Sequence, residues 1–536
     1  MSSYSCIQLD DLPDEILMII FQKLNQLDVL LSLTHVNKRL NKIAHDQNFT
    51  SHVTLYECLS NNKIRPLPDQ IVDRFFEILP SIHHKIKWLD LETIYMERIL
   101  LATNYPNLYG LGLYGIDIKK SISIFTDDNI FTHTVANQIS SFVIDFVTNN
   151  GLSSQYLHNI VFTNIFTMFT NLEYLKFYPS SIGFYQLTFD ISPPTVMSST
   201  LLELHISVYY FTDCLYLLDG RFQQLRTFHV NIFHIKFTSL TIANEEKLRN
   251  LRCFSLCSFM RTHVYDELIV PLLQRMLNLE KLHLCLKVNH YKGFIDGNDL
   301  KKNIINHMSR LNQFTCNIRL YNYSYNQTNV PSNKDIQHSF KDFINNRIIS
   351  CADHFQDNHY SYCHFYSHPY RLKHYDNVSN NFPGGIFKFV YEVSLHDERP
   401  FEHEFFLRIA QSFPFMKELT LINKKPQKNK LNNENQDLLI IKYPHLTKLN
   451  LLETHDDYVE LFLLNTKLYL PNNVRLNAHY ESLRLLTDNF ERDATRINCA
   501  KMRYVCFDNV FRFPKNSKDY FLDIEMPLLR LFPTIV

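Results

Sequence analysis

The sequence predicts an α/β protein in which a small N-terminal module of three helices precedes a long solenoid, with parallel strands on its concave face and helices on its convex face. Three observations support this fold class. Residues 10–44 combine helix start signals with an excess of apolar side chains, and a short leucine-rich phrase recurs along the rest of the chain. Segments between the phrases place apolar residues at helical spacing.

The helical module begins at Pro13, which suits the first position of a helix, and Asp14 and Glu15 then place negative charge at the helix N-terminus. Asp28 and Asn37 are predicted to cap the second and third helices. Three short helices cannot bury all of their apolar surface by themselves, so we expect the module to dock on another protein. The apolar residues of the first helix cover more than one face: Ile16, Leu17, Met18, Ile19, Ile20, Phe21 and Leu24.

The same stretch resembles the F-box over the whole length of that motif. The residues that carry the resemblance are Leu12-Pro13, Asp14-Glu15-Ile16-Leu17, Ile20-Phe21, Leu24, Asp28-Val29, Leu33, Val36-Asn37 and Lys38-Arg39-Leu40. Leu40 stands where many F-boxes have Trp, and it keeps the position apolar. The resemblance implies a three-helix motif that binds the Skp-type adaptor of cullin-RING ubiquitin ligases, while the rest of the chain selects a protein target. An ordinary helical hairpin that caps the solenoid is the alternative.

We expect the adaptor contact to consist of apolar residues from the first two helices. They are Leu12, Pro13, Ile16, Leu17, Ile20, Phe21, Leu24, Val29, Leu33 and Val36.

The recurring phrase has the form L-x-x-L-x-L, and its last two apolar residues alternate as in a strand that buries one face. It begins at Ile86, Leu108, Leu172, Leu201, Leu225, Leu251, Leu279, Leu311, Val390, Met416, Leu446 and, in a fainter copy, Met502. Residues 265–276 and 405–410 are typical of helices between such strands. The phrase resembles a divergent leucine-rich repeat, in which Phe often replaces Leu and the usual Asn is mostly absent. A set of unrelated amphipathic strands is the alternative, and residues 115–165 contain no clear phrase.

These patterns divide the chain into five parts. We assign residues 1–50 to an F-box, 51–85 to a helical linker and 86–318 to a solenoid like that of leucine-rich repeats. Residues 319–388 are assigned to an irregular repeat or insertion, and 389–536 to a C-terminal solenoid of the same kind as 86–318.

The irregular part, residues 319–388, contains a helical candidate at 335–349 and a strict alternation from Tyr360 to Tyr366, which is a strand signal. Its Cys and His residues have no paired C-x-x-C spacing, so we expect a strand packed on the solenoid and no zinc site. A second group should lie on the concave wall, where we expect a small polar surface and no metal or redox site. Its members are His205, His229, His283, Cys253, Cys257 and Cys285.

Composition limits the possible partners and the location of the protein. The 536 residues carry a formal net charge of +0, so neither nucleic acid nor an anionic membrane is an expected partner. No apolar run approaches the ~18 residues of a membrane span. Eleven scattered cysteines and an N-terminus without a basic and apolar leader suit a reducing compartment, and we expect the protein in the cytoplasm or nucleus.

Enzyme motifs are almost absent from the sequence. A formal G-x-G-x-x-G occurs at Gly110, Gly112 and Gly115, but these glycines lie inside a strand candidate and do not link a strand to a helix. Cys58 has no context that would activate a thiol. We therefore expect no catalytic residue, no cofactor and no metal.

Two function classes remain after these exclusions. The first is a non-catalytic substrate receptor of a Skp-cullin-F-box ligase, and the second is a scaffold that uses the same surfaces without ligase activity. The target is unknown. Tyr174, Lys176 and Tyr178 are candidate target contacts because outward tyrosines are favoured interface anchors. Trp88, the single tryptophan, is expected to cover the joint between the linker and the first repeat.

Overall fold

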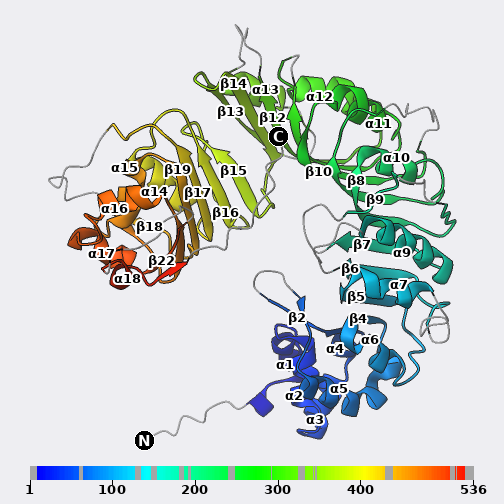
Figure 1. Cartoon of the computed structure of the whole chain (residues 1–536). Helices are drawn as coiled ribbons and strands as arrows, with labels where there is room; N and C mark the ends of the chain where they lie inside the picture. Colours follow the sequence, from blue (N-terminus) through cyan, green and yellow to red (C-terminus); the bar gives the residue numbers. More distant parts are fainter. Residues whose placement is uncertain are drawn as a thin grey trace, which may run out of the picture. The chain divides into compact units, whose positions relative to one another are not determined.

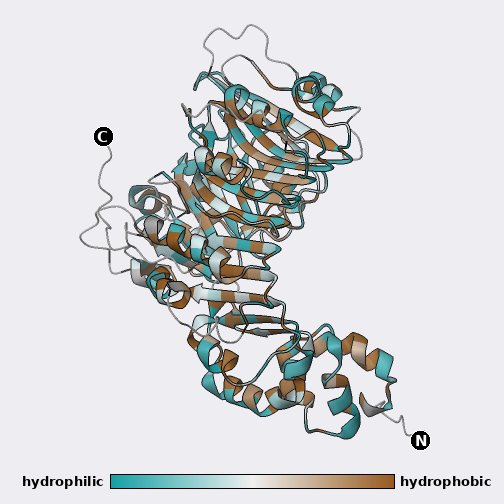
Figure 2. Ribbon diagram, turned by 90° about the vertical axis from the view of Figure 1, so that its right-hand side faces the viewer, coloured by the Kyte–Doolittle hydropathy of each residue, from teal (hydrophilic) through white to brown (hydrophobic). Residues whose placement is uncertain are grey.

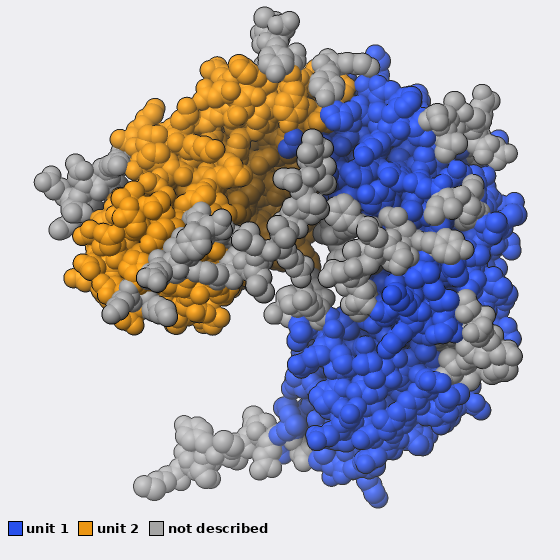
Figure 3. Space-filling model, in the orientation of Figure 1, with its two compact units in different colours: residues 1–288, 298–316 blue, residues 289–297, 317–536 orange. Residues whose placement is uncertain are grey.

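The chain forms two compact units, shown in different colours in Figure 3. Unit 1 comprises residues 1–288 and 298–316, and unit 2 comprises residues 289–297 and 317–536. The computed structural model describes residues 9–59, 64–126, 135–146, 154–179, 186–190, 195–238, 248–290, 293–323, 332–341, 343, 347–428, 439–506, 514 and 516–525.

Unit 1 begins with the predicted helices, and their caps differ in part from the prediction. Pro13 occupies the N-cap position of α1, one residue before the predicted place. The cap of α2 is Asn25 and not Asp28, because the Asn25 side chain accepts the N–H of Leu27 at 2.9 Å. Asn37 caps α3 as predicted and accepts the N–H of Leu40 at 2.7 Å. The helices are η1 (Leu9–Asp11), α1 (Asp14–Phe21), α2 (Gln26–Leu33), α3 (Lys38–Ala44) and α4 (Gln47–Thr50).

A large sheet follows, with the strand order β1-β4-β5-β6-β7-β8-β9-β10-β11-β12, and each neighbouring pair in this order from β1 to β11 is parallel. Its first strand, β1, lies within the segment predicted to be a helical linker. The strands are β1 (His52–Leu55), β4 (Trp88–Glu92), β5 (Gly110–Ile116), β6 (Ser141–Phe146), β7 (Tyr174–Pro179), β8 (Glu203–Tyr210), β9 (Thr227–His234), β10 (Cys253–Thr262), β11 (Lys281–Asn289) and β12 (Gln313–Asn322). Strands β2 (Glu57–Cys58) and β3 (Ile64–Arg65) form a separate antiparallel pair.

The alternating apolar residues of the phrase lie in register across this sheet, as Leu204 pairs with Phe228 and Ile206 with Val230. All of these side chains are buried, which confirms the predicted core face of the strands. Strand β6 fills the gap in the predicted series, since Phe142 lies opposite Leu175 and is buried. Residues 115–165 therefore contain a strand of the same kind that the leucine-rich pattern did not reveal. Figure 2 shows hydrophobic and hydrophilic residues intermixed along the strands.

Helices connect most of these strands, and Figure 1 shows α7, α9, α10 and α11 on one side of the strand series. The predicted helix at 265–276 is present as η3 followed by α11. None of the helices in the described part of the chain is both long and apolar enough to cross a membrane. The helical elements after the N-terminal module are α5 (Asp69–Ile82), η2 (His83–Lys85), α6 (Thr93–Leu100), α7 (Ile118–Thr126), α9 (Ser154–Met168), α10 (Phe211–Leu217), η3 (Tyr265–Ile269), α11 (Val270–Gln274), α12 (Gly297–Asn303) and η4 (Ile305–His307).

Unit 2 contains the antiparallel strands β13 (Ile348–Phe355) and β14 (Tyr360–Ser367), and β14 also pairs with residues 317–322 of β12. The predicted strand around Tyr360 is thus confirmed. The predicted helix at 335–349 is shorter, because α13 (Asn333–Ser339) ends early and β13 starts at Ile348. Tyr362 and Tyr366 are buried, so these strands form part of the core of the unit.

A second parallel sheet completes unit 2, with the order β15-β16-β17-β19-β21-β22-β23. Its strands are β15 (His374–Val378), β16 (Glu392–His396), β17 (Glu418–Asn423), β19 (Lys448–Thr454), β21 (Val474–Asn477), β22 (Met502–Val505) and β23 (Asp523–Glu525), and β18 (Ile441–Lys442) pairs separately with β20 (Leu468–Tyr469). The helices are α14 (His403–Ser412), which includes the predicted helix at 405–410, α15 (Asp456–Leu463), α16 (Tyr480–Leu486), α17 (Asp493–Cys499) and α18 (Ser517–Tyr520).

One register prediction for this sheet is wrong. The faint phrase at Met502 predicts that Tyr504 faces outward, but Tyr504 is fully buried and lies opposite Leu476. Leu476 itself belongs to a strand that the phrase pattern missed. Residue 507, the last position of that phrase, lies outside the described residues.

Candidate functional site

A group of exposed apolar side chains lies on α1 and in the short segments that follow α1 and α2, and we call it the helical apolar face. Its members are Ile16, Ile19, Ile20, Leu24 and Val36, which are 43%, 56%, 39%, 54% and 59% exposed. Large apolar residues exposed so close together in sequence indicate a surface that another molecule covers. Four of the five belong to the predicted adaptor contact. The fifth, Ile19, was predicted to add apolar surface to the first helix but was not included in that contact.

Other residues of the predicted contact lie elsewhere in the module. Leu17, Phe21 and Val29 are buried at 0%, 4% and 2% exposure, so their side chains belong to the helical core and are not available at this surface. Leu12 and Leu33 are half-buried, and Pro13 is exposed beside α1. The periodicity of a short apolar helix does not tell which side faces the protein interior, because both sides carry similar residues. Adaptor binding itself stays a prediction.

Polar contacts hold the helical module in place. The Arg39 guanidinium forms an ion pair with Asp14 at 2.6 Å and also donates to the carbonyl of Leu12, which connects α3 to the start of α1. Arg74 of α5 donates to the carbonyl of Leu31 at 2.5 Å, and α2 packs against α5. The segment Leu12-Pro13 and the helical apolar face are therefore presented on a module that is tied to the strands following it.

A second candidate surface is the polar sheet face of unit 1, formed by the strand residues between the buried apolar positions. The predicted target contacts Tyr174, Lys176 and Tyr178 all lie on this face and are half-buried. The Lys176 ammonium is 5.5 Å from the centre of the Tyr178 ring. Burial raises the pKa of Asp145, which lies opposite Tyr178, to about 6, and the positive charge of Lys176 works against that rise.

Histidines and cysteines occupy the same face further along the sheet. His205 lies opposite His229, and their rings stack with centroids 4.3 Å apart and planes inclined by 10°. His283 is two strands beyond His229, separated from it by Ser255, and contacts the Thr315 hydroxyl at 2.8 Å. The predicted group thus splits, because His283 does not reach the stacked pair.

The cysteines of that predicted group also separate. Cys257 lies opposite Cys285, and their mutual hydrogen bond together with burial raises the pKa of Cys257. Cys253 lies opposite Thr227 and Lys281, away from that pair.

The neighbour that the sequence did not link to the histidines is Glu203, whose Oε1 lies 2.6 Å from His205 Nε2. The signal for it was its position two residues before His205 on the same strand face.

Trp88 lies where the linker strand meets β4, the position predicted for it. Its Nε1 donates to Asp90 Oδ1 at 2.8 Å, and its ring is 5.7 Å from that of His52 on β1. The ring lies over Gly110, where a Cβ would come within 2.0 Å of Trp88 Cε3. Gly112 in the same way leaves space for Asp90. The glycines of the G-x-G-x-x-G pattern are thus strand residues that accommodate neighbouring side chains.

The Cys and His residues of the irregular segment do not gather around a common point. Cys351 and His364 lie opposite each other on paired strands, and Cys363 belongs to the other face of β14. Burial lowers the pKa of His364, which packs against the rings of Tyr366 and Tyr375. Among the described residues, the side chains of this segment do not place three metal-ligating atoms within 4.8 Å of one another.

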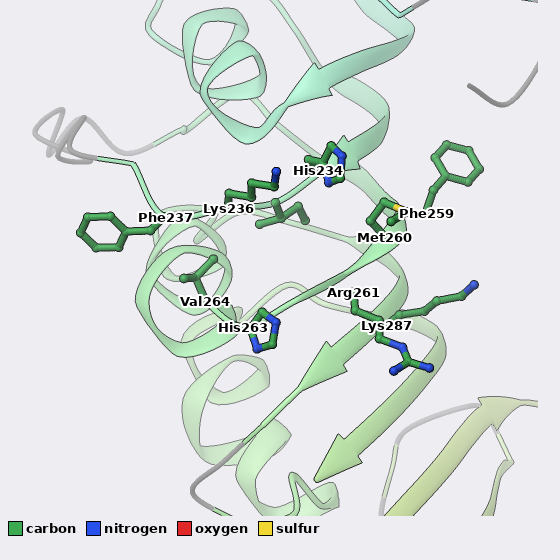
Figure 4. Close-up of a pocket in the computed structure, with 10 residues that line it drawn as sticks. His234, Lys236, Phe237, Phe259, Met260, Arg261, His263, Val264 and Lys287 are labelled. Carbon is green, nitrogen blue, oxygen red and sulfur yellow. The ribbon is translucent and has the colours of Figure 1, made fainter. Parts of the chain in front are cut away.

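An open pocket of about 570 Å³ lies at the carboxyl ends of β9, β10 and β11. Arg261 and Lys287 are opposite each other in register, and Lys236, His234 and His263 add further basic groups. The labelled side chains in Figure 4 combine these basic groups with the apolar Phe237, Phe259, Met260 and Val264. Such a lining suits a ligand that is both acidic and apolar.

Comparison with known families agrees with the helical part of this description. A family model described as F-box-like matches residues 9–55, from η1 to the last residue of β1. No curated protein matches the chain by sequence. The first 55 residues therefore contain an F-box-like domain, and this domain carries the helical apolar face.

Proposed function

We propose that this chain is the substrate-recognition subunit of a Skp-cullin-F-box type ubiquitin ligase, and that it acts in the cytoplasm or nucleus. The F-box docks on the Skp-type adaptor, and the two sheet units hold a protein target. Other subunits transfer ubiquitin, so this chain contributes no catalytic residue and acts by bringing the target close. The observation that carries the proposal is the helical apolar face, since it lies in the domain type that typically binds such adaptors.

We also infer that the sheet units are divergent leucine-rich-repeat solenoids. In favour of this are the one-strand repeat, the parallel register of successive phrases and the buried apolar pairs such as Leu204 and Phe228. In such a scaffold, the concave strands present side chains to a partner. Tyr174, Lys176 and Tyr178 and the basic pocket near Arg261 are then the surfaces that we expect a target to use.

The first experiment tests docking. The full chain and its Leu12-Pro13→Ala-Ala variant are captured from cells, and bound adaptor and cullin are measured. We expect the double change to abolish adaptor capture, because the Arg39 hydrogen bond to the Leu12 carbonyl holds this segment at the surface of the helical module. The melting profile of the sheet units should be retained, because the changed residues lie outside the strands of both sheets. Undiminished adaptor binding by the variant would contradict the proposed contact. Recovery of the adaptor without a cullin would favour the scaffold alternative.

The second experiment tests target binding. Proteins captured with and without proteasome inhibition are compared between the natural chain and a Tyr174→Ala, Tyr178→Ala variant. A target that accumulates under inhibition should be lost from the variant while adaptor capture continues. A target that is retained would place the binding surface elsewhere. Deleting residues 319–388 is not a suitable test, because Tyr362 and Tyr366 are part of the core of unit 2.

A further inference from the structure

Three potential metal ligands come together on the polar sheet face of unit 1. Glu203 and His205 lie two residues apart on β8 and share one face, and His229 lies directly opposite His205 on β9. One ligand atom from each of the three lies within 4.8 Å of the others. Among the described residues, this is the one group of three or more His, Cys, Asp or Glu side chains that meets this geometry.

The backbone positions of the three residues are fixed by the core behind them. Leu204, Ile206, Phe228 and Val230 are 0%, 0%, 0% and 1% exposed, and they alternate with the ligand positions on the same two strands. Parallel pairing on both sides of β8 and β9 adds hydrogen bonds that prevent the strands from sliding. Ligands that project from such rigid elements need only side-chain rotation to reach a metal.

The distances are close to what a tetrahedral site requires. Metal–nitrogen and metal–oxygen distances of about 2.0–2.2 Å put neighbouring ligand atoms about 3.4 Å apart in a tetrahedron. Glu203 Oε1 is already 2.6 Å from His205 Nε2, and the two histidine rings are stacked 4.3 Å apart. A bound metal would replace the Glu203–His205 hydrogen bond and require the two rings to turn out of their stack.

The chemistry of the donor set selects a class of metal. Two imidazole nitrogens and one carboxylate suit zinc and similar divalent transition metals, whereas calcium and magnesium prefer oxygen ligands alone. The side chains of His205 and Glu203 are 19% and 38% exposed, so a cation can approach from solvent and a fourth position stays accessible. The single carboxylate supplies a negative charge that favours a cation at this point.

We propose that Glu203, His205 and His229 bind a divalent cation of the zinc class, with the fourth position open to solvent. This proposal is independent of adaptor docking, because the three residues lie on β8 and β9 and the proposed adaptor contact lies within the F-box-like domain. The open position is of the type that takes water or a ligand group from a bound molecule.

Cobalt is a suitable probe, because the visible absorption of bound Co²⁺ reports the number of its ligands and amino-acid side chains do not absorb in that range. The purified full chain, treated with a chelator and dialysed, is titrated with Co²⁺, and Zn²⁺ is then added in competition. The variants are Glu203→Gln and His229→Gln, and the matched control is His283→Gln, which changes a histidine on the same face outside the group. We expect saturable binding in the natural chain and control, and at least about tenfold weaker binding in both variants.

Thermal unfolding gives a second readout that tests each variant for folding. Zn²⁺ should raise the melting temperature of the natural chain and of His283→Gln, and it should have little effect on the two variants. Glu203→Gln keeps the size of a partly exposed side chain, so its fold should be unchanged by far-ultraviolet circular dichroism. Absence of saturable Co²⁺ binding in the natural chain, or equal affinity in the variants and the control, would overturn the proposal.

Discussion

The helical apolar face allows a quantitative test of adaptor docking that leaves the core of the module intact. Ile20 and Leu24 are 39% and 54% exposed, so together they leave almost one whole aliphatic side chain in contact with solvent. Complete burial of such a side chain contributes about 1.5–3 kcal/mol. Because alanine keeps the Cβ atom, the Ile20→Ala, Leu24→Ala variant should lose about 1–2 kcal/mol of binding free energy. The expected increase in Kd is about five- to thirtyfold.

The assay is titration calorimetry or a biosensor measurement with purified Skp-type adaptor and the full chain. A matched control is the Leu485→Ala, Ile497→Ala variant, since these two side chains are 63% and 53% exposed on α16 and α17 of unit 2. Both variants change exposed apolar residues, and such surface changes usually alter the free energy of unfolding by about 0.5 kcal/mol or less.

The two variants should therefore unfold at similar temperatures and differ only in adaptor affinity. Equal affinity of both variants for the adaptor would refute the assignment of the helical apolar face as the contact. A fall in affinity that accompanies a large loss of stability in the first variant would also refute it, because the exposed fractions used above would then be wrong.

Three further outcomes are expected. Leu282 is 1% exposed, so Leu282→Ala should lower the free energy of unfolding by about 2–5 kcal/mol. His283→Ala should lower it by about 1 kcal/mol, because the hydrogen bond to Thr315 is lost. Equal losses for the two variants in chemical denaturation would contradict the strand register. Gly110→Ala should displace the Trp88 ring and shift its fluorescence, and an unchanged spectrum would contradict the close packing. Burial raises the pKa of Asp213 to about 7, so the folded state binds this proton more tightly than the unfolded state, and stability should fall as pH rises from about 4 to about 7. Asp213→Asn should flatten that part of the profile, and an equal slope in both proteins would exclude Asp213 as its source.

Local signals in the sequence were sufficient for the helical module and for most strands. Asn37 caps α3 by a hydrogen bond that spans three residues, and such short-range chemistry can be recognised without the fold. The alternation in the leucine-rich phrase likewise depends only on which face of a strand is buried, so Leu282 and Leu284 could be placed in the core in advance. Strand β6 was not predicted, because its buried core residues Phe142 and Ile144 are not leucine.

Surfaces could be predicted only in part, because exposure depends on the packing of elements distant in sequence. Leu17 and Ile20 have the same apolar character on one helix, yet Leu17 is buried and Ile20 is exposed. Similarly, Tyr504 belongs to the core through its pairing with Leu476, and a neighbour 28 positions away leaves no local signal.

The sequence by itself determined the F-box-like module, the mixed α/β class and the inward face of most strands, since all three follow from the order of residues over a few turns or one strand. Only the tertiary structure decided which apolar residues remain for a partner and which polar residues meet. Glu203, His205 and His229 illustrate the physical reason, because their ligand atoms approach one another only when β8 and β9 pair in one particular register.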